Sequence, residues 1–382
     1  MNRDRFPGLA DGWARLDAPA GSQPVDSAIE AAAELMRSGM VGNLGATFEA
    51  SERLGAFLSE ARDAAGAFAG GDPRGVVFGP SMTTLTLSFA AAVGRTLRPG
   101  DEIVCTRLDH DGNVAPWLLA AERAGATVRF AEPDRETLQL TAADVEAVLS
   151  DRTRWVATTA ASNAVGSVPE LGGIVAVAHA AGARVYVDAV HSAPHRPLEA
   201  EALGCDAIVC SAYKWFGPHQ SILWARPELL EELTPDKLRP SSDTVPWRWE
   251  TGTSAFEGIA GLVAAARYVQ DEVGYSAIRA HEDALFGRLL DGLASVAGVT
   301  VHGAPADRVP TVMLSVAGRR AEEAAAALAT ERIAVWHGNY YALELSRFLG
   351  LEPDGAVRAG IVHYNDDSDV DRLVAALERI AA

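Results

Sequence analysis

Short β-rich runs alternate with longer alanine-rich stretches from about residue 74 onward, and this alternation constrains the fold more than any other feature. The β-rich runs lie at residues 75–78, 102–105, 127–130, 155–158, 184–188 and 207–210. The last three are almost continuously apolar, as expected for strands that helices cover on both faces. The pattern predicts an α/β fold with a mainly parallel sheet between helices.

A turn-rich region at residues 234–252 interrupts the alternation, and a long helix is expected to begin near Phe256. The elements expected after it are an amphipathic segment at 278–293, strands near Val299 and Val312, and a closing helix from Asp369. These elements predict a smaller α+β unit at the C-terminal end. The expected division is an N-terminal segment (1–19) that packs on the small domain, a large domain (20–270) and a small C-terminal domain (271–382).

The net charge of −18, from 33 basic and 51 acidic residues, disfavours binding to nucleic acids and to anionic membrane surfaces. Small-molecule chemistry is therefore the better expectation. The three cysteines contain no CxxC pair, which argues against a disulfide framework and against a structural zinc site. The first 13 residues contain no apolar stretch, so we expect no secretory signal and a cytoplasmic protein.

Lys214 stands among apolar and aromatic residues, and Lys237 is the only other lysine of the chain. A lysine in such surroundings is less readily explained as surface decoration. Lys214 follows one predicted strand, and Asp188 ends the strand before it. Since ligands of open α/β sheets bind at the carboxyl ends of the strands, the amine and the carboxylate are expected at one sheet edge.

The loop Gly79–Thr84 follows the first predicted strand and precedes a helical run, a context that suits phosphate binding. Taken alone, the loop is better explained as an ordinary strand-to-helix turn with an N-cap. GxGxxG and Walker A motifs are absent, which removes the main support for a nucleotide site. Ser211 and Lys214 match S-x-x-K, but the companion motifs of serine acyl enzymes are absent.

A pyridoxal phosphate enzyme needs a lysine amine for a Schiff base, a carboxylate for the pyridine nitrogen and a cradle for the phosphate. Lys214, Asp188 and the loop at residues 81–84 supply these three groups. The sequence therefore predicts pyridoxal 5'-phosphate as the cofactor, and it predicts no metal site.

The segments Val187–His191 and Ser211–Lys214 resemble the class V aminotransferase family of pyridoxal-phosphate-dependent enzymes, which includes cysteine desulfurases. The resemblance covers nearly the whole chain and implies an aspartate aminotransferase-like fold of type I. It implies that Asn163 bonds the phenolic oxygen of the cofactor and that the loop 109–117 covers its ring. It also implies that Arg358 holds the substrate carboxylate.

The resemblance further implies a homodimer, because Thr253 matches the segment that reaches the phosphate in the partner subunit. His191 is expected as a neighbour of the cofactor, and His195 as a structural residue. The cofactor-binding residues expected in this way are Met82, Thr83, Asp111, Asn163, Asp188, His191, Ser211, Tyr213, Lys214 and Thr253.

Two positions depart from the family pattern. Asp111 stands where the family usually has a histidine that stacks on the cofactor ring, with His110 directly before it. Tyr341 stands where desulfurases carry the cysteine that attacks the substrate sulfur. Because the three cysteines lie on or beside predicted strands, we expect no persulfide-forming cysteine.

The leading functional expectation is an enzyme that cleaves a carbon–sulfur bond of an amino acid by β-elimination, with Lys214, Asp188 and Arg358 as its catalytic residues. Transamination, epimerisation and decarboxylation use the same residues and stay open. A non-catalytic scaffold of the same fold is a further alternative, although a scaffold does not need these three residues together.

Overall fold

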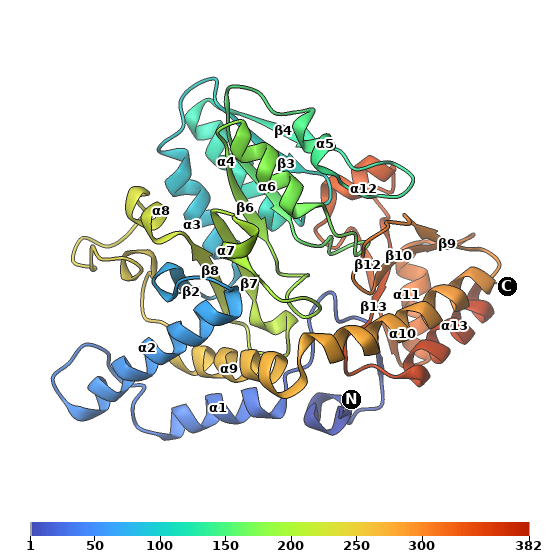
Figure 1. Ribbon diagram of the computed structural model, residues 1–382. Coiled ribbons are helices and arrows are strands. Elements are labelled where there is room, and N and C mark those ends of the chain that lie inside the picture. The colour runs from blue at the N-terminus through green and yellow to red at the C-terminus, as the bar shows by residue number, and fades with distance from the viewer. Residues whose placement is uncertain (1, 382) are drawn as a thin grey trace.

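The structure is a computed structural model that describes residues 2–381. A seven-stranded sheet lies at the centre of its larger part (Figure 1). The strands are β2 (Val76–Gly79), β3 (Glu102–Thr106), β4 (Thr127–Ala131), β5 (Thr153–Thr159), β6 (Arg184–Asp188), β7 (Ala207–Ser211) and β8 (Ser221–Ala225). Their spatial order is β2-β8-β7-β6-β5-β3-β4. Only β8 runs against its neighbours, and every other adjacent pair is parallel.

Helices cover both faces of this sheet. They are α1 (Asp26–Arg37), α2 (Glu49–Ala69), α3 (Met82–Gly94), α4 (Ala115–Ala124), α5 (Ala142–Glu146), α6 (Leu171–Ala180), α7 (Ala200–Leu203), α8 (Pro227–Glu232) and α9 (Phe256–Arg267). Apolar residues of α2, α6 and α9 pack on one face, and those of α3, α4 and α8 pack on the other. Along β2, Val76 and Phe78 belong to the core formed with α2, α6 and α9, whereas Val77 belongs to the core formed with α3, α4 and α8. Since successive strand residues point to opposite faces, both faces of the sheet are apolar.

A second, four-stranded sheet contains residues of the C-terminal part of the chain. Its order is β12-β13-β10-β9, and all its pairs are antiparallel. The strands are β9 (Val299–His302), β10 (Thr311–Val316), β12 (Trp336–Gly338) and β13 (Ala356–Gly360). The accompanying helices are α10 (Tyr275–Ser295), α11 (Ala321–Thr330) and α13 (Asp367–Ala381), whereas Leu345 of α12 (Leu343–Leu349) joins a core of the large sheet. Figure 1 shows this sheet beside the large one, with α10 leading toward it from α9.

The N-terminal segment reaches this second part of the molecule. Strand β1 (Ala14–Arg15) pairs in parallel with β11 (Ile333–Ala334). The expected α/β fold, with a mainly parallel sheet and a smaller C-terminal sheet region, is confirmed. The domain boundaries expected from the sequence stay a prediction. No helix within residues 2–381 combines the length and the apolar character that crossing a bilayer requires.

Candidate active site

Lys214 and Asp188 lie at the carboxyl ends of adjacent parallel strands. Asp188 is the last residue of β6, and Lys214 lies in the single helical turn that directly follows β7. Their side chains are buried, with exposed fractions of 3% for Asp188 and 8% for Lys214. Both residues line a narrow cavity of about 50 Å³. The structure therefore brings the predicted amine and carboxylate into one site.

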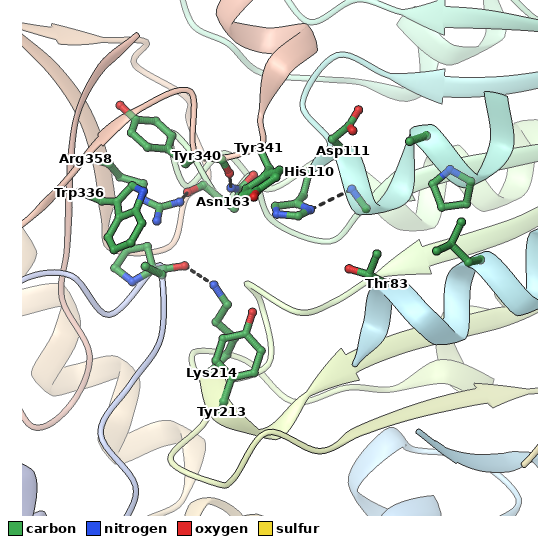
Figure 2. Close-up of a pocket in the computed structure, with 16 residues that line it drawn as sticks. Thr83, His110, Asp111, Asn163, Tyr213, Lys214, Trp336, Tyr340, Tyr341 and Arg358 are labelled. Carbon is green, nitrogen blue, oxygen red and sulfur yellow. Dashed lines mark hydrogen bonds between the residues drawn. The ribbon is translucent and has the colours of Figure 1, made fainter. Parts of the chain in front are cut away.

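The amine of Lys214 lies in surroundings that disfavour its charge. Burial and the positive charge of Arg358 together lower its pKa from 10.5 to about 7, and the carboxylate of Asp188 opposes the shift. Nζ donates a hydrogen bond to the backbone oxygen of Pro19 (Figure 2). A large neutral fraction near pH 7 makes this amine a competent nucleophile and base.

The carboxyl group of Asp188 is placed by its own loop. Burial raises its pKa to about 6, and the backbone N–H of Val190 and the charge of Lys214 oppose the rise. The N–H of Val190 donates to Oδ1 at 2.9 Å. The group is therefore mainly ionised at neutral pH and can hold a cationic ring nitrogen.

The start of α3 offers an anion-binding turn beside these residues. Ser81 is the N-cap, and its Oγ accepts a hydrogen bond from the N–H of Thr84 at 3.1 Å. The N–H of Met82 points to Ser211 Oγ at 3.4 Å, and Thr83 lines the narrow cavity and the wider one outside it. Because backbone N–H groups at a helix start carry partial positive charge, this turn suits a phosphate group.

Asn163 lies between the narrow cavity and the C-terminal sheet. Its Nδ2 donates to the backbone oxygen of Tyr340 at 3.0 Å, and its own backbone oxygen accepts from Arg358 Nη1 at 2.8 Å (Figure 2). Its buried Oδ1 has no hydrogen-bond partner within the described chain. Since a buried acceptor without a partner is costly, the site suits a ligand that carries a donor.

Arg358 supplies a buried cation opposite Lys214. It lies on β13, has an exposed fraction of 3%, and places its guanidinium 4.6 Å from the centre of the Tyr340 ring. Burial lowers its pKa to about 10, so it stays charged at neutral pH. Its Nε has no partner among the described residues. This free donor, on a guanidinium that stays charged, is suited to a substrate carboxylate.

Tyr213 and His191 complete the inner walls. Tyr213 lines both cavities, and its ring stacks on His219 with centroids 5.1 Å apart. His191 Nε2 lies 2.9 Å from Thr311 Oγ1, and burial together with the charge of His195 holds its pKa well below the ordinary value. His191 therefore stays neutral.

His195 lies deeper and pairs with Glu282 of α10, with 2.8 Å between Nδ1 and Oε2. The structural role expected for His195 stays a prediction, which this contact supports.

His110 and Asp111, adjacent residues of the loop 109–113, line different parts of the site. His110 lines both cavities, and burial with the charges of Lys214 and Arg358 lowers its pKa to about 3. Asp111 lines only the wider cavity, and burial raises its pKa. From the sequence, Asp111 is expected among the cofactor contacts and His110 only as its neighbour. The sequence signal for His110 as a site residue was its position directly before Asp111.

Thr253 is exposed on the loop before α9 and lines neither cavity of its own chain.

The structure brings the other cofactor-binding residues expected from the sequence together around the two cavities. Ser211 lies just beneath them, and its Oγ is 2.8 Å from Ser221 Oγ. Thr159 also lines the narrow cavity, and its residue type carried no signal in the sequence. Lys214, Asp188, Asn163 and the start of α3 together fit pyridoxal phosphate.

The wider cavity has a volume of about 530 Å³ and opens toward solvent. The three cysteines, Cys105, Cys205 and Cys210, are buried and line neither cavity. Burial raises the pKa of each thiol, to about 12 for Cys205. These thiols lack the exposed, electropositive setting of reactive cysteines.

Comparisons with known proteins give the family. A cysteine desulfurase of Klebsiella pneumoniae is 33% identical over 382 residues, covering 96% of this chain and 92% of that protein. The aminotransferase-like protein FGM3 of Gibberella zeae is 30% identical over 393 residues, covering 99% and 97%. The apo structure of a cysteine desulfurase from Thermococcus onnurineus NA1 superposes with a TM-score of 0.92 at 26% identity, covering 99% and 97%.

The family model described as aminotransferase class-V matches residues 14–373, which is nearly the whole chain. This match agrees with the lysine, the carboxylate and the helix start that meet at the edge of the large sheet. The chain belongs to the class V aminotransferase family of pyridoxal-phosphate-dependent enzymes, and it is similar to cysteine desulfurases.

Proposed function

We propose that the chain is a carbon–sulfur lyase that acts by β-elimination on an amino acid derived from cysteine. The observation that carries the proposal is one cavity lined by Lys214 and Arg358, with Asp188 beneath and none of the three cysteines in its walls. The name cysteine desulfurase, which two of the similar proteins carry, supports a sulfur-containing amino acid as the substrate.

Each residue of the site has a distinct task in this proposal. Bound pyridoxal phosphate supplies an aldehyde and an electron-withdrawing ring that weaken the bonds to the α-carbon of an amino acid. Asp188 would hold the ring nitrogen, Asn163 the phenolic oxygen and the start of α3 the phosphate. Arg358 binds the α-carboxylate in a bidentate manner and so orients the substrate.

Lys214 is the proton carrier. Its buried Nζ, with a pKa of about 7, takes the α-proton of the substrate. The carbon–sulfur bond then breaks, and sulfur leaves with the electron pair and acquires a proton. The overall reaction converts the conjugate R–S–CH₂–CH(NH₃⁺)–COO⁻ and one water into the thiol R–SH, pyruvate and ammonium. No oxidant or reductant takes part.

The position of Tyr341 separates this proposal from a persulfide-forming desulfurase. Tyr341 borders the cavity, the resemblance matches it to the nucleophilic cysteine of desulfurases, and a phenol cannot store sulfur. We therefore propose that the sulfur product leaves the site instead of remaining on the protein.

We further propose a cytoplasmic homodimer with shared sites. Thr253 is exposed and lies outside the cavities of its own chain, which leaves it available to the site of a second copy. Sedimentation at micromolar concentration tests this assembly, and a fully active monomer would contradict it.

The reaction is tested with purified protein, pyridoxal phosphate and a panel of cysteine, cystine and cysteine conjugates. We expect pyruvate, ammonium and thiol in equal amounts, and no activity in Lys214→Ala. Keto acid formation without release of thiol would instead support transamination, the second candidate, which the aminotransferase-like relative suggests. Absence of both products, together with absence of a borohydride-trapped cofactor on Lys214, would support the non-catalytic scaffold.

A further inference from the structure

Large apolar side chains surround the mouth of the wider cavity. Trp336, Tyr341 and Leu87 line it with exposed fractions of 50%, 70% and 42%. Ala115 and Pro116 add apolar surface to the same lining. Apolar side chains gathered around a cavity that also contains a few polar groups are typical of a site for an apolar ligand group.

Trp336 is placed directly beside the residue that binds the substrate carboxylate. It is the cross-strand partner of Arg358 in the antiparallel pair β12 and β13. Directly opposite residues of such a pair project from the same face of the sheet. Figure 2 shows the indole of Trp336 next to the guanidinium of Arg358. A substrate whose carboxylate is held by Arg358 therefore has the indole within reach of its side chain.

Tyr341 is held at the mouth by an unusual backbone. Tyr340 and Tyr341 both have left-handed conformations, with φ of 51° and 60°, which are unfavourable for residues other than glycine. The backbone oxygen of Tyr341 accepts from the N–H of Asp111 at 2.6 Å, and that of Tyr340 accepts from Asn163. The Tyr341 ring lies near His110, with centroids 5.4 Å apart (Figure 2). The two hydrogen bonds hold the backbone that carries the phenol ring at the mouth of the cavity.

The charges of the cavity limit which side chains it can accept. Asp111, Lys214 and Arg358 are its only residues of the Asp, Glu, Lys and Arg types within the described chain. In the proposed function Lys214 serves the cofactor and Arg358 binds the α-carboxylate. Among residues 2–381 of the chain, no further Lys or Arg lines the cavity to pair a second carboxylate, and Asp111 would repel one. The lining therefore disfavours cystine and dicarboxylic amino acids.

We propose that Trp336 and Tyr341 determine specificity by selecting cysteine S-conjugates that carry an aromatic or large apolar group on sulfur. The inference rests on the proposed function, which it narrows to one class of substrates. Rings that pack against indole and phenol gain both buried apolar area and favourable aromatic geometry.

The first test compares S-benzyl-L-cysteine, S-methyl-L-cysteine and L-cystine by the kcat/KM of pyruvate release. We expect S-benzyl-cysteine to exceed S-methyl-cysteine by about tenfold or more, and cystine to be the poorest of the three. The benzyl-to-methyl ratio is expected to fall to near one in a Trp336→Ala/Tyr341→Ala variant. Trp336→Phe and Tyr341→Phe keep a ring and should keep most of the ratio, which separates a specificity role from misfolding.

Phe48→Ala is the matched control. Phe48 is another exposed aromatic residue, with an exposed fraction of 50%, and it lines neither active-site cavity. The control should retain the wild-type ratio. A ratio near one in the wild type, or a wild-type ratio in the double alanine variant, would overturn the inference and leave the lyase proposal standing.

The second test measures binding without catalysis. Lys214→Ala, supplemented with pyridoxal phosphate, is titrated with the three compounds in a calorimeter. Tighter binding of S-benzyl-cysteine that disappears when Trp336 and Tyr341 are also replaced by alanine supports the inference, even if no compound yields pyruvate and the lyase proposal fails. Equal affinity for the benzyl and methyl compounds would overturn it.

Discussion

Replacing Lys214 by methionine should stabilise the cofactor-free protein. The wild-type amine is buried, and burial is the main reason why its pKa falls from 10.5 to about 7. Folding therefore works against the protonated form of this residue. Methionine has a similar length and no charge, so it removes this cost while filling the same space.

The expected gain follows from the pKa of Lys214. The shift from 10.5 to about 7 corresponds to about 4 kcal/mol at pH 7, with about 1.4 kcal/mol for each pKa unit. The variant also loses the hydrogen bond from Nζ to the backbone oxygen of Pro19, which is worth about 1 kcal/mol. The free energy of unfolding should therefore rise by about 3 kcal/mol.

The gain should depend on pH in a defined direction. Between pH 7 and 10.5 the unfolded chain binds more protons at Lys214 than the folded chain does, so the stability of the wild type rises with pH there. The variant lacks this contribution. The difference between the two proteins should shrink by about 1.4 kcal/mol per pH unit above pH 7.

Urea denaturation of both cofactor-free proteins at pH 7, 8 and 9 measures the difference. Lys237→Met is the matched control because it removes the only other lysine, which forms a surface ion pair with Asp243 at 3.1 Å. Its effect should stay within about 1 kcal/mol. A Lys214→Met protein that is no more stable than the wild type at pH 7, or a difference that does not change with pH, would refute the reasoning.

Three further variants test other parts of the site. Asp188→Asn keeps the shape of the side chain but removes its charge, and we expect kcat to fall by about 100-fold or more while borohydride still traps the cofactor on Lys214. Arg358→Lys keeps the charge but loses the planar pair of donors, so steady-state kinetics should show a KM higher by about tenfold or more, and an unchanged KM would contradict the carboxylate role. His195→Ala leaves the buried carboxyl of Glu282 without its partner and should cost about 3–5 kcal/mol in urea unfolding, whereas His195→Leu combined with Glu282→Leu should cost much less.

The large sheet could be predicted because its signal is local. Each parallel strand carries its own apolar run, and these runs were visible at β3, β5, β6 and β7 without knowledge of their neighbours. Strand β8 was not anticipated, although it lies between β2 and β7. It follows β7 through the loop 212–220, which contains only a single helical turn, so the long helix that normally separates parallel strands, and makes them recognisable, is absent there.

The candidate site was predictable where residue type and strand position together determine the chemistry. Lys214 and Asp188 belong to consecutive strand ends, and the parallel pairing of β6 and β7 brings such ends together. His110 and Tyr340 could not be assigned in this way. The direction of their side chains depends on loops that are held by hydrogen bonds from Gly112 and Asn163.

The order of apolar runs and the types of the residues at their ends determined the α/β class, the cofactor chemistry and the resemblance to a family. Only the tertiary structure decided that His110 lines the narrow cavity beside Lys214, whereas Asp111 lines only the wider cavity. It also decided how Arg358 and Trp336 meet at the mouth of the site. The reason is physical: strand periodicity depends on near neighbours, whereas burial, pKa and side-chain direction depend on contacts between segments as distant as Pro19, Lys214 and Arg358.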